Sequence, residues 1–283
     1  MNALLEPAEV APGVAMLSLR TPTLPPATHT NAYLIGTGDL VLVEPASPYE
    51  PEIAQATAWV EGRIAQGQRL RAVLLTHHHP DHIGGADAIR ARFGVPVWAH
   101  ARTAERLQGK VAIDRHLEHG ERIELDGPTP MVVEAMHTPG HAPGHLCFYE
   151  PESRSLVAGD MVAGVGTIIV ETKDGDMQQY LASLEAMAAR GAAQLLPAHG
   201  DPIADPAARL AFYVQHRLQR EAKVLAALRT FDTWTDLDQL VPIAYADTAR
   251  AAWPFARLAL EAHLVKLARE GLADTREGRW RAT

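Results

Sequence analysis

The chain has 283 residues, of which 47% are hydrophobic and 21% are charged, as is typical of a folded globular protein. Its formal net charge of −8 argues against a polyanionic partner, because nucleic-acid binders usually carry a basic face. A single cysteine, Cys147, excludes an intramolecular disulfide and a cysteine-based zinc site. The fourteen histidines are the unusual feature, because a group of them is concentrated between His77 and His82.

No segment approaches the roughly 20 apolar residues that are needed to cross a bilayer. The sequence from Met1 to Pro7 also lacks the basic and apolar regions of a signal peptide. We therefore expect a cytoplasmic protein that makes no use of a membrane.

Strand and helix patterns alternate over the first two thirds of the chain. In chain order we predict strands at 14–19, 32–35 and 40–43, a helix at 51–66, a strand at 71–76, a helix at 85–93, strands at 95–99, 132–137, 145–149 and 155–158, a helix at 178–190 and a strand at 193–197. The pattern predicts an α/β body with two sheets and with helices on the outside.

The last part of the chain changes character. A long amphipathic helix is predicted from Pro206 to Arg229, followed by an all-helical stretch and a short hairpin at 272–282. We place the domain boundary near residue 230, which gives a catalytic domain at 1–230 and a small C-terminal domain at 231–283.

The strongest chemical signal is the segment 76–82, THHHPDH, which follows a predicted buried strand. Because Pro80 cannot continue a helix through this segment, we expect an extended loop. Alternate residues of such a loop point to one side, so His77 and His79 can share one metal ion. Asp81 and His82 can face a second position. Imidazole and carboxylate groups suit zinc with an open position for water.

Three further polar residues occupy similar settings near predicted strand ends. They are His141 in TPGH, Asp160 in AGD and His199 in PAHGD. The ordered set HxHxDH, TPGH, GD and HG resembles the metallo-beta-lactamase superfamily, because these four separate motifs match in order.

This resemblance implies an αββα sandwich with two zinc ions per chain, iron or manganese being alternatives. One ion would be held by His77, His79 and His141, and the other by Asp81, His82 and His199, with Asp160 bridging both. The resemblance further implies a metal-bound hydroxide as the nucleophile and no covalent enzyme intermediate. Asp81 would orient that hydroxide and pass a proton to the leaving group.

Three nearby residues have other expected roles. His78 is the spacer of the motif and is not expected to bind metal. His145 competes with His141 for the third histidine position, but TPGH favours His141, so His145 is expected to orient a ligand. The family usually has Asp where this chain has Glu44, and the longer side chain should change the hydrogen-bonding geometry near the site without necessarily affecting metal binding.

The resemblance extends to the subgroup of beta-lactamase-like protein 2. It is carried by TNAYL at 30–34, by GxGT at 164–167 and by the long helix at 206–229, and it implies that the C-terminal domain is winged-helix-like. Between Asp232 and Thr283 acidic residues slightly outnumber basic ones, whereas a duplex binder is usually basic. We expect this domain to cover the mouth of the active site or to mediate association, for example as a homodimer.

The favoured function is hydrolysis of an ester-type bond in a small molecule, namely a thioester, an ester or a lactone. The alternative, which the subgroup suggests, is an endoribonuclease acting on single-stranded RNA. Hydrolysis of β-lactams is a third option, disfavoured by the absence of a signal peptide pattern. A non-enzymatic regulatory protein is poorly supported, since no ligand position is missing.

Overall fold

The computed structural model describes residues 6–283, which form two compact units. The first unit is made of residues up to Thr138 together with Gly144–Thr167 and Gly191–Pro206. The second consists of Pro139–Pro143, Ile168–Arg190 and Ala207–Thr283. Residues 1–5, on which the signal-peptide prediction partly depends, lie outside the described residues. The domain boundary near residue 230 stays a prediction.

The first sheet has seven strands, in the order β1 to β7. They are β1 (Ala8–Ala11), β2 (Val14–Arg20), β3 (His29–Ile35), β4 (Asp39–Val43), β5 (Arg69–Leu74), β6 (Val97–Ala99) and β7 (Arg115–His116). Strands β1 to β4 pair antiparallel, whereas β4 to β7 pair parallel. Because β4 and β5 are parallel, the residues that follow them emerge at the same edge of the sheet.

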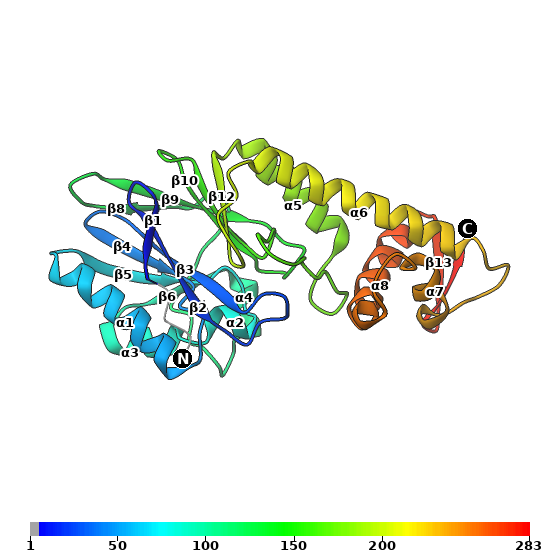
Figure 1. The fold of residues 1–283 in the computed structure, drawn as a ribbon, viewed down its shortest axis with the longest axis horizontal. Coiled ribbons are helices and arrows are strands. Elements are labelled where there is room, and N and C mark those ends of the chain that lie inside the picture. The colour runs from blue at the N-terminus through cyan, green and yellow to red at the C-terminus, as the bar shows by residue number, and fades with distance from the viewer. Residues whose placement is uncertain (1–5) are drawn as a thin grey trace. The chain divides into compact units, whose positions relative to one another are not determined.

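The second sheet has five strands, in the order β12-β11-β10-β9-β8. They are β8 (Arg122–Leu125), β9 (Met131–His137), β10 (Leu146–Glu150), β11 (Ser155–Gly159) and β12 (Gln194–Pro197). Within the first unit the two sheets form adjacent layers (Figure 1). Tyr33 and Leu74 of the first sheet belong to one buried apolar cluster with Val133 and Phe148 of the second, and this cluster is the core between the layers.

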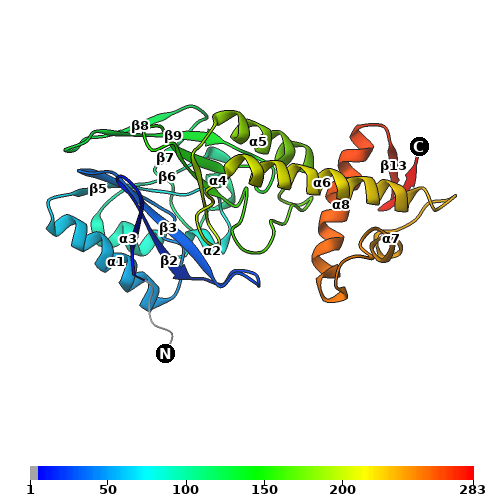
Figure 2. The ribbon, with the colours of Figure 1, turned by 45° about the horizontal axis from the view of Figure 1, so that its top comes forward.

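Helices cover the other face of the first sheet (Figure 2). The helices of this unit are α1 (Glu50–Ala65), α2 (Pro80–Ile83), α3 (Ala86–Phe93) and α4 (Ala101–Arg106). Val60 of α1 and Ile89 of α3 pack with Leu42 and Val73 in a second buried cluster. Alternate residues along the strands of the first sheet thus face the second sheet on one side and the helices on the other.

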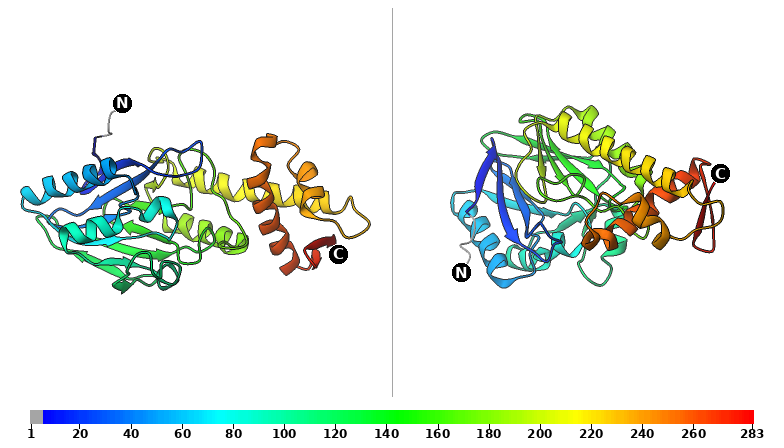
Figure 3. Two further views of the ribbon diagram at one scale, coloured as in Figure 1. Left: turned by 90° about the horizontal axis from the view of Figure 1, so that it is seen from below. Right: turned by 45° about the vertical axis from the view of Figure 1, so that its right-hand side comes forward.

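The second unit is mainly helical and contains the C-terminal hairpin. Its elements are α5 (Met177–Arg190), α6 (Pro206–Leu228), α7 (Leu237–Ala244), the 3-10 helix η1 (Arg250–Ala252), α8 (Trp253–Arg269), β13 (Ala273–Arg276) and β14 (Arg279–Ala282). Leu240, Leu264 and Trp280 belong to one buried cluster that joins α7, α8 and the hairpin, which are the orange and red segments of Figure 3. Asp236 and Gln239 cap α7 reciprocally.

The predicted order of strands and helices is confirmed, with ends that differ by a few residues. One local expectation was wrong: the segment after His79 is not an extended loop, because Pro80 begins the one-turn helix α2. Proline lacks an N–H, and the first residue of a helix needs none, so this position suits it. The short elements β1, α4, β7 and β8 were not predicted from the sequence. Among the helices described over residues 6–283, none is long and apolar enough to span a membrane.

Candidate metal centre

The candidate centre lies where parallel strands end. In the first sheet, β5 runs into Thr76 and the histidine-rich segment, and the neighbouring strand β4 is followed by Glu44. In the second sheet, Asp160 follows β11 and His199 comes shortly after its parallel neighbour β12. The sequence thus places chemistry-bearing residues at strand ends, which fixes them on a rigid scaffold.

The loop that carries His199 is held by the TNAYL motif. The Asn31 side-chain amide donates to the carbonyl oxygens of Pro197 and Gly200 at 2.9 and 2.8 Å. The Tyr33 hydroxyl donates to the same Pro197 oxygen at 2.7 Å. These hydrogen bonds explain the structural role of the TNAYL motif, because they fix the backbone on both sides of His199.

His77 and His79 present nitrogen atoms to each other. His77 Nε2 lies 2.8 Å from His79 Nδ1. The other ring nitrogen of His77, Nδ1, lies 2.9 Å from the Thr76 hydroxyl, so Nε2 carries the lone pair when Nδ1 donates there. The two nitrogens are within hydrogen-bond distance and face each other, and the prediction that they share one ion stays a prediction.

A second group consists of Asp81, His82, Asp160 and His199. His82 Nε2 lies 3.5 Å from Asp160 Oδ2 and 3.8 Å from Asp81 Oδ1. His199 Nε2 lies 3.3 Å from Asp160 Oδ1 and 3.7 Å from Asp81 Oδ2. Ligands about 2.1 Å from a tetrahedral zinc ion are roughly 3.4 Å from one another. The four side chains are therefore spaced as ligands of one ion would be.

A buried nitrogen supports the fit to a metal. His82 is fully buried, and among the described residues its Nε2 has no hydrogen-bond partner. Its Nδ1 lies 2.9 Å from Glu44 Oε1, and His199 Nδ1 donates to the His29 carbonyl oxygen at 2.9 Å. Each ring is thus held through one nitrogen while the other faces the carboxylates, which is how proteins orient metal-binding histidines.

The electrostatics of this group favour a cation at its centre. Burial alone would lower the pKa of His82, but Glu44, Asp160 and Asp81 raise it well above its ordinary value. Burial alone would raise the pKa of Asp160, yet His199 and His82 hold it well below its ordinary value. The pKa of Asp81 is lowered too, because His82 and a hydrogen bond from Thr23 outweigh its burial. Carboxylates in this cluster stay charged and attract positive charge.

The seventh predicted ligand, His141, belongs to the segment Pro139–Pro143 of the second unit. Its Nδ1 donates to the Ile169 carbonyl oxygen at 2.8 Å, which leaves the lone pair on Nε2. The ring is therefore held in the tautomer that a metal ligand needs. The other six predicted ligands lie in the first unit, and the metal-binding roles of all seven residues stay predictions.

His145 has the orienting position that the sequence predicted for it. It is fully buried, its Nε2 accepts from the Asp160 backbone N–H at 3.1 Å, and its Nδ1 lies 2.9 Å from the Thr138 hydroxyl. Gly159 has a φ of +50°, and a Cβ added there would lie 2.5 Å from His145 Nε2. Only glycine allows this approach, which fixes the backbone of Asp160.

Residue-by-residue interpretation of the sequence missed three threonines. Thr23 bonds Asp81, Thr76 lies against His77, and Thr138 lies against His145. The available signal was position, because Thr76 and Thr138 each closely follow a strand and precede a histidine motif.

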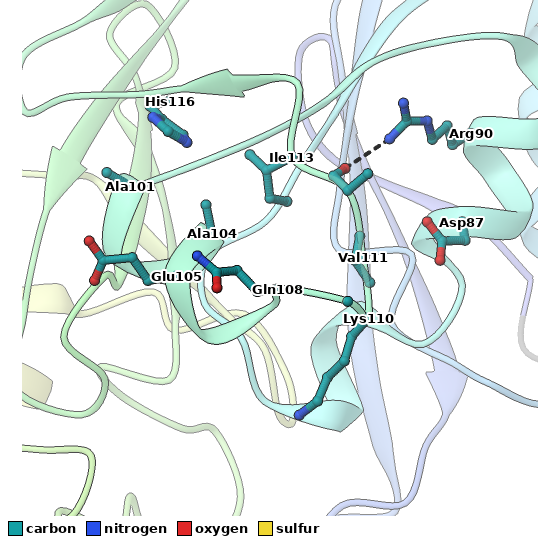
Figure 4. Close-up of a pocket in the computed structure, with 12 residues that line it drawn as sticks. Asp87, Arg90, Ala101, Ala104, Glu105, Gln108, Lys110, Val111, Ile113 and His116 are labelled. Carbon is teal, nitrogen blue, oxygen red and sulfur yellow. Dashed lines mark hydrogen bonds between the residues drawn. The ribbon is translucent and has the colours of Figure 1, made fainter.

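A pocket of about 650 Å³ opens elsewhere in the first unit, beside α4 (Figure 4). None of the predicted ligands lines it. Its Arg90 is already bonded to the Ala112 carbonyl oxygen and to Asp114. The chemistry therefore points to the histidine cluster, and the size of this pocket does not outweigh it.

Comparison with known proteins agrees with this geometry. Residues 25–199 match the family described as the metallo-beta-lactamase superfamily. The chain belongs to the metallo-beta-lactamase superfamily. Residues 237–280 match the beta-lactamase associated winged helix domain. The predicted fold, an α/β sandwich of this superfamily followed by a winged helix domain, is confirmed.

Two curated relatives illustrate the range of the superfamily. The beta-lactamase-like protein 2 homolog of Drosophila melanogaster is 30% identical over 86% of this chain and 83% of its own length. The atrochrysone carboxyl ACP thioesterase of Aspergillus chevalieri is 33% identical over 71% of this chain and 60% of its own length. The chain is therefore an enzyme of a hydrolase family, as predicted.

Two solved structures share the fold over nearly the whole chain. A metallo-beta-lactamase family protein from Thermus thermophilus superposes with a TM-score of 0.76 at 25% identity, covering 97% of this chain and 100% of that one. A beta-lactamase domain protein from Burkholderia ambifaria gives 0.82 at 22% identity, covering 100% and 97%. The His and Asp groups of the cluster, within this superfamily, indicate metal binding.

Proposed function

We propose that this chain is a dinuclear zinc hydrolase of small acyl substrates, namely thioesters, esters or lactones. The observation that carries the proposal is the cluster of Asp81, His82, Asp160 and His199 beside the His77–His79 pair. His77, His79 and His141 would hold one ion, and Asp81, His82 and His199 the other, with Asp160 between them. The nitrogen and oxygen donors suit zinc, and iron or manganese would also accept them.

When bound, two such ions would polarise the scissile carbonyl and lower the pKa of water from 15.7 to about 7. Asp81 is the residue we assign to proton transfer. Its carboxylate faces His82 and His199 and accepts a hydrogen bond from Thr23, so it is oriented and charged. It would accept the proton of the attacking water and return it to the leaving group. In a thioester, the C–O bond forms, the C–S bond breaks, and the sulfur leaves as a thiol.

The acyl substrate class rests on two supports. Relatives whose names specify a thioesterase, from Aspergillus chevalieri and from a Cryptosporiopsis species, share 33% and 32% of their aligned residues with this chain. The net charge of −8 also disfavours a polyanionic substrate. A small-molecule substrate with no membrane partner is the matching proposal, and a homodimer is the assembly we propose to test.

A second candidate is cleavage of single-stranded RNA. It is favoured by the C-terminal hairpin, where Arg276 and Arg279 are opposite each other and exposed. Arg281 lies over the Trp234 ring at 4.8 Å, and cations beside aromatic rings are common in single-strand binding. Arg281 is already paired with Asp274, which reduces the positive charge of this surface.

The test is a side-by-side panel of a generic thioester, a lactone, a β-lactam and single-stranded RNA, at low and moderate salt. We expect acyl hydrolysis that depends weakly on salt, is abolished by a chelator, and falls steeply in Asp81→Asn. Cleavage of RNA that depends on Asp81, without acyl hydrolysis, would reverse the order of the two candidates. Cleavage of RNA that survives in Asp81→Asn would identify a contaminating nuclease.

A further inference from the structure

Glu44 is a buried carboxylate beside the histidine cluster that the predicted ligand set does not use. It directly follows β4 and is fully buried. Its φ is +57°, in the left-handed region that a residue with a Cβ rarely adopts. Such a backbone conformation is unfavourable, and it is maintained where the surroundings require it, often at functional sites.

One oxygen of Glu44 serves two histidines. Glu44 Oε1 lies 2.9 Å from His82 Nδ1. The same oxygen accepts from the Thr76 hydroxyl, whose oxygen lies 2.9 Å from His77 Nδ1. The protons can be ordered in only one sense along this path: His77 Nδ1–H donates to Thr76, Thr76 donates to Glu44, and His82 Nδ1–H donates to Glu44. Both rings are then held with their lone pairs on Nε2.

His77 and His82 belong to different halves of the centre. His77 Nε2 faces His79, whereas His82 Nε2 faces Asp81 and Asp160. We propose that Glu44 is a positioning residue shared by the two metal positions, which fixes the tautomer of one histidine in each. This inference rests on the proposed metal-binding function and deepens it.

The length of the side chain explains why glutamate occupies this place. From its left-handed backbone position, Glu44 brings a single oxygen to both Thr76 and His82, while Oε2 has no hydrogen-bond partner among the described residues. An aspartate is shorter by one methylene and would have to give up one of the two contacts or move the strand end. The longer side chain of glutamate therefore allows one oxygen to contact both Thr76 and His82.

The experiment compares four full-length proteins: the wild type, Glu44→Gln, Thr76→Val and the matched control Glu150→Gln. Glu150 is also a buried glutamate of the first unit, but its carboxylate accepts hydrogen bonds from the turn residues Glu152 and Ser153, away from the histidine cluster. The two zinc dissociation constants are measured by competition with a chromophoric chelator. The protons and hydrogen bonds of each ring nitrogen are measured by long-range ¹H–¹⁵N spectra of the metal-free chains.

We expect Glu44→Gln to weaken the binding of both zinc ions by about 10- to 100-fold, the range seen when outer partners of ligands are removed. Thr76→Val removes only the path to His77, so it should weaken one ion and spare the other. Glu150→Gln should change neither. In the spectra, Glu44→Gln should disturb the Nδ1–H hydrogen bonds of both His77 and His82, and Thr76→Val only that of His77.

The outcomes separate this inference from the proposed function. A wild type that binds no zinc overturns the metal-dependent function, while the ¹H–¹⁵N spectra still test the role of Glu44. A wild type that binds two ions, with Glu44→Gln weakening neither or only one, overturns the shared role. Thr76→Val provides a test of the Thr76 path even where Glu44→Gln fails to fold.

Discussion

The two ends of the paired strands β4 and β5 both hold a buried acidic side chain, but they differ in how its surroundings are satisfied. At the amino end, the buried carboxylate of Asp39 is bonded by Arg69 at 2.8 Å and by Arg71 at 2.5 Å. At the carboxyl end, Glu44 and His82 are also buried, but His82 Nε2 has no hydrogen-bond partner in the described part of the chain. The charges at the amino end are paired within the chain, so we call it the closed end. The groups at the carboxyl end are arranged to bind a cation from outside the chain, so we call it the open end.

This difference distinguishes charged side chains that stabilise the fold from charged side chains that we assign to function. The side chains of Arg69 and Arg71 are 68% and 41% exposed, so water solvates them, and their ion pairs with Asp39 connect the two strands. The histidine cluster instead gathers acidic side chains around nitrogen lone pairs. Buried groups in that state need a proton or a metal ion for balance.

The largest expected effect comes from the open end. Asp81→Asn keeps the shape of the side chain but removes the proton acceptor and a negative charge near the proposed ions, so turnover should fall by about 10²- to 10⁴-fold. His78→Ala, at the spacer of the motif, is the matched control and should retain most activity. Steady-state hydrolysis of a thioester measures both. Equal losses at the two positions would mean that the inward and outward faces of the segment are assigned wrongly.

Metal removal should lower the free energy of unfolding through the histidine cluster at the open end, independently of the Asp39 ion pairs at the closed end. Zinc at a hundred times its dissociation constant should raise the free energy of unfolding by about 2.7 kcal/mol, because it binds the folded state. Thermal unfolding with zinc and with a chelator measures this, and Asp39→Asn should show the same zinc-dependent difference as the wild type. A loss of that difference in Asp39→Asn would show that the two ends are not independent.

A smaller effect is expected at the closed end. Asp39→Asn should lower the free energy of unfolding by about 1 kcal/mol, since its arginine partners are largely solvated. Although burial alone would raise the pKa of Asp39, Arg69 and Arg71 hold it below its ordinary value of 3.8. Its contribution is therefore complete above the pKa of the unfolded chain and is lost as the pH falls through the lower folded pKa.

Denaturant unfolding of both proteins over a range of pH checks this. The difference between wild type and Asp39→Asn should be constant above about pH 5 and shrink below about pH 4. A difference that grows as the pH falls would contradict the assigned partners.

The smallest effect is expected in the pocket of Figure 4, which shares no residue with the cluster. Lys110→Ala removes an exposed cation from its rim and should leave both acyl hydrolysis and zinc binding within experimental error. A clear change in kcat/KM would place the substrate in this pocket and move the site away from the strand ends.

Much of the fold could be predicted because its signals are local. The buried run of β5 followed by THHHPDH predicted a strand and a ligand-bearing segment, and both are present. The helix at Pro80 was missed because one turn is too short to show periodicity. Strands β7 and β8 were missed for the same reason, since two and four residues carry almost no pattern.

The candidate site was predicted as a set of residues but not as a network. Motif order indicated which histidines belong together, and TPGH favoured His141 over His145. The link from Glu44 to two histidines depends on a left-handed backbone and on Thr76 from another strand end, neither of which a linear pattern reports. The pair of Asp39 and Arg69 could have been found, because both residues begin neighbouring strands.

The most direct test of the central claim is the metal content of the purified full-length chain. Elemental analysis, paired with mass spectrometry under native conditions, counts the ions per chain before and after zinc is added. We predict close to two ions per chain, and clearly fewer in a variant that carries His82→Ala together with Asp81→Asn. At most one ion in the wild type, with no gain on zinc addition, would contradict the dinuclear centre.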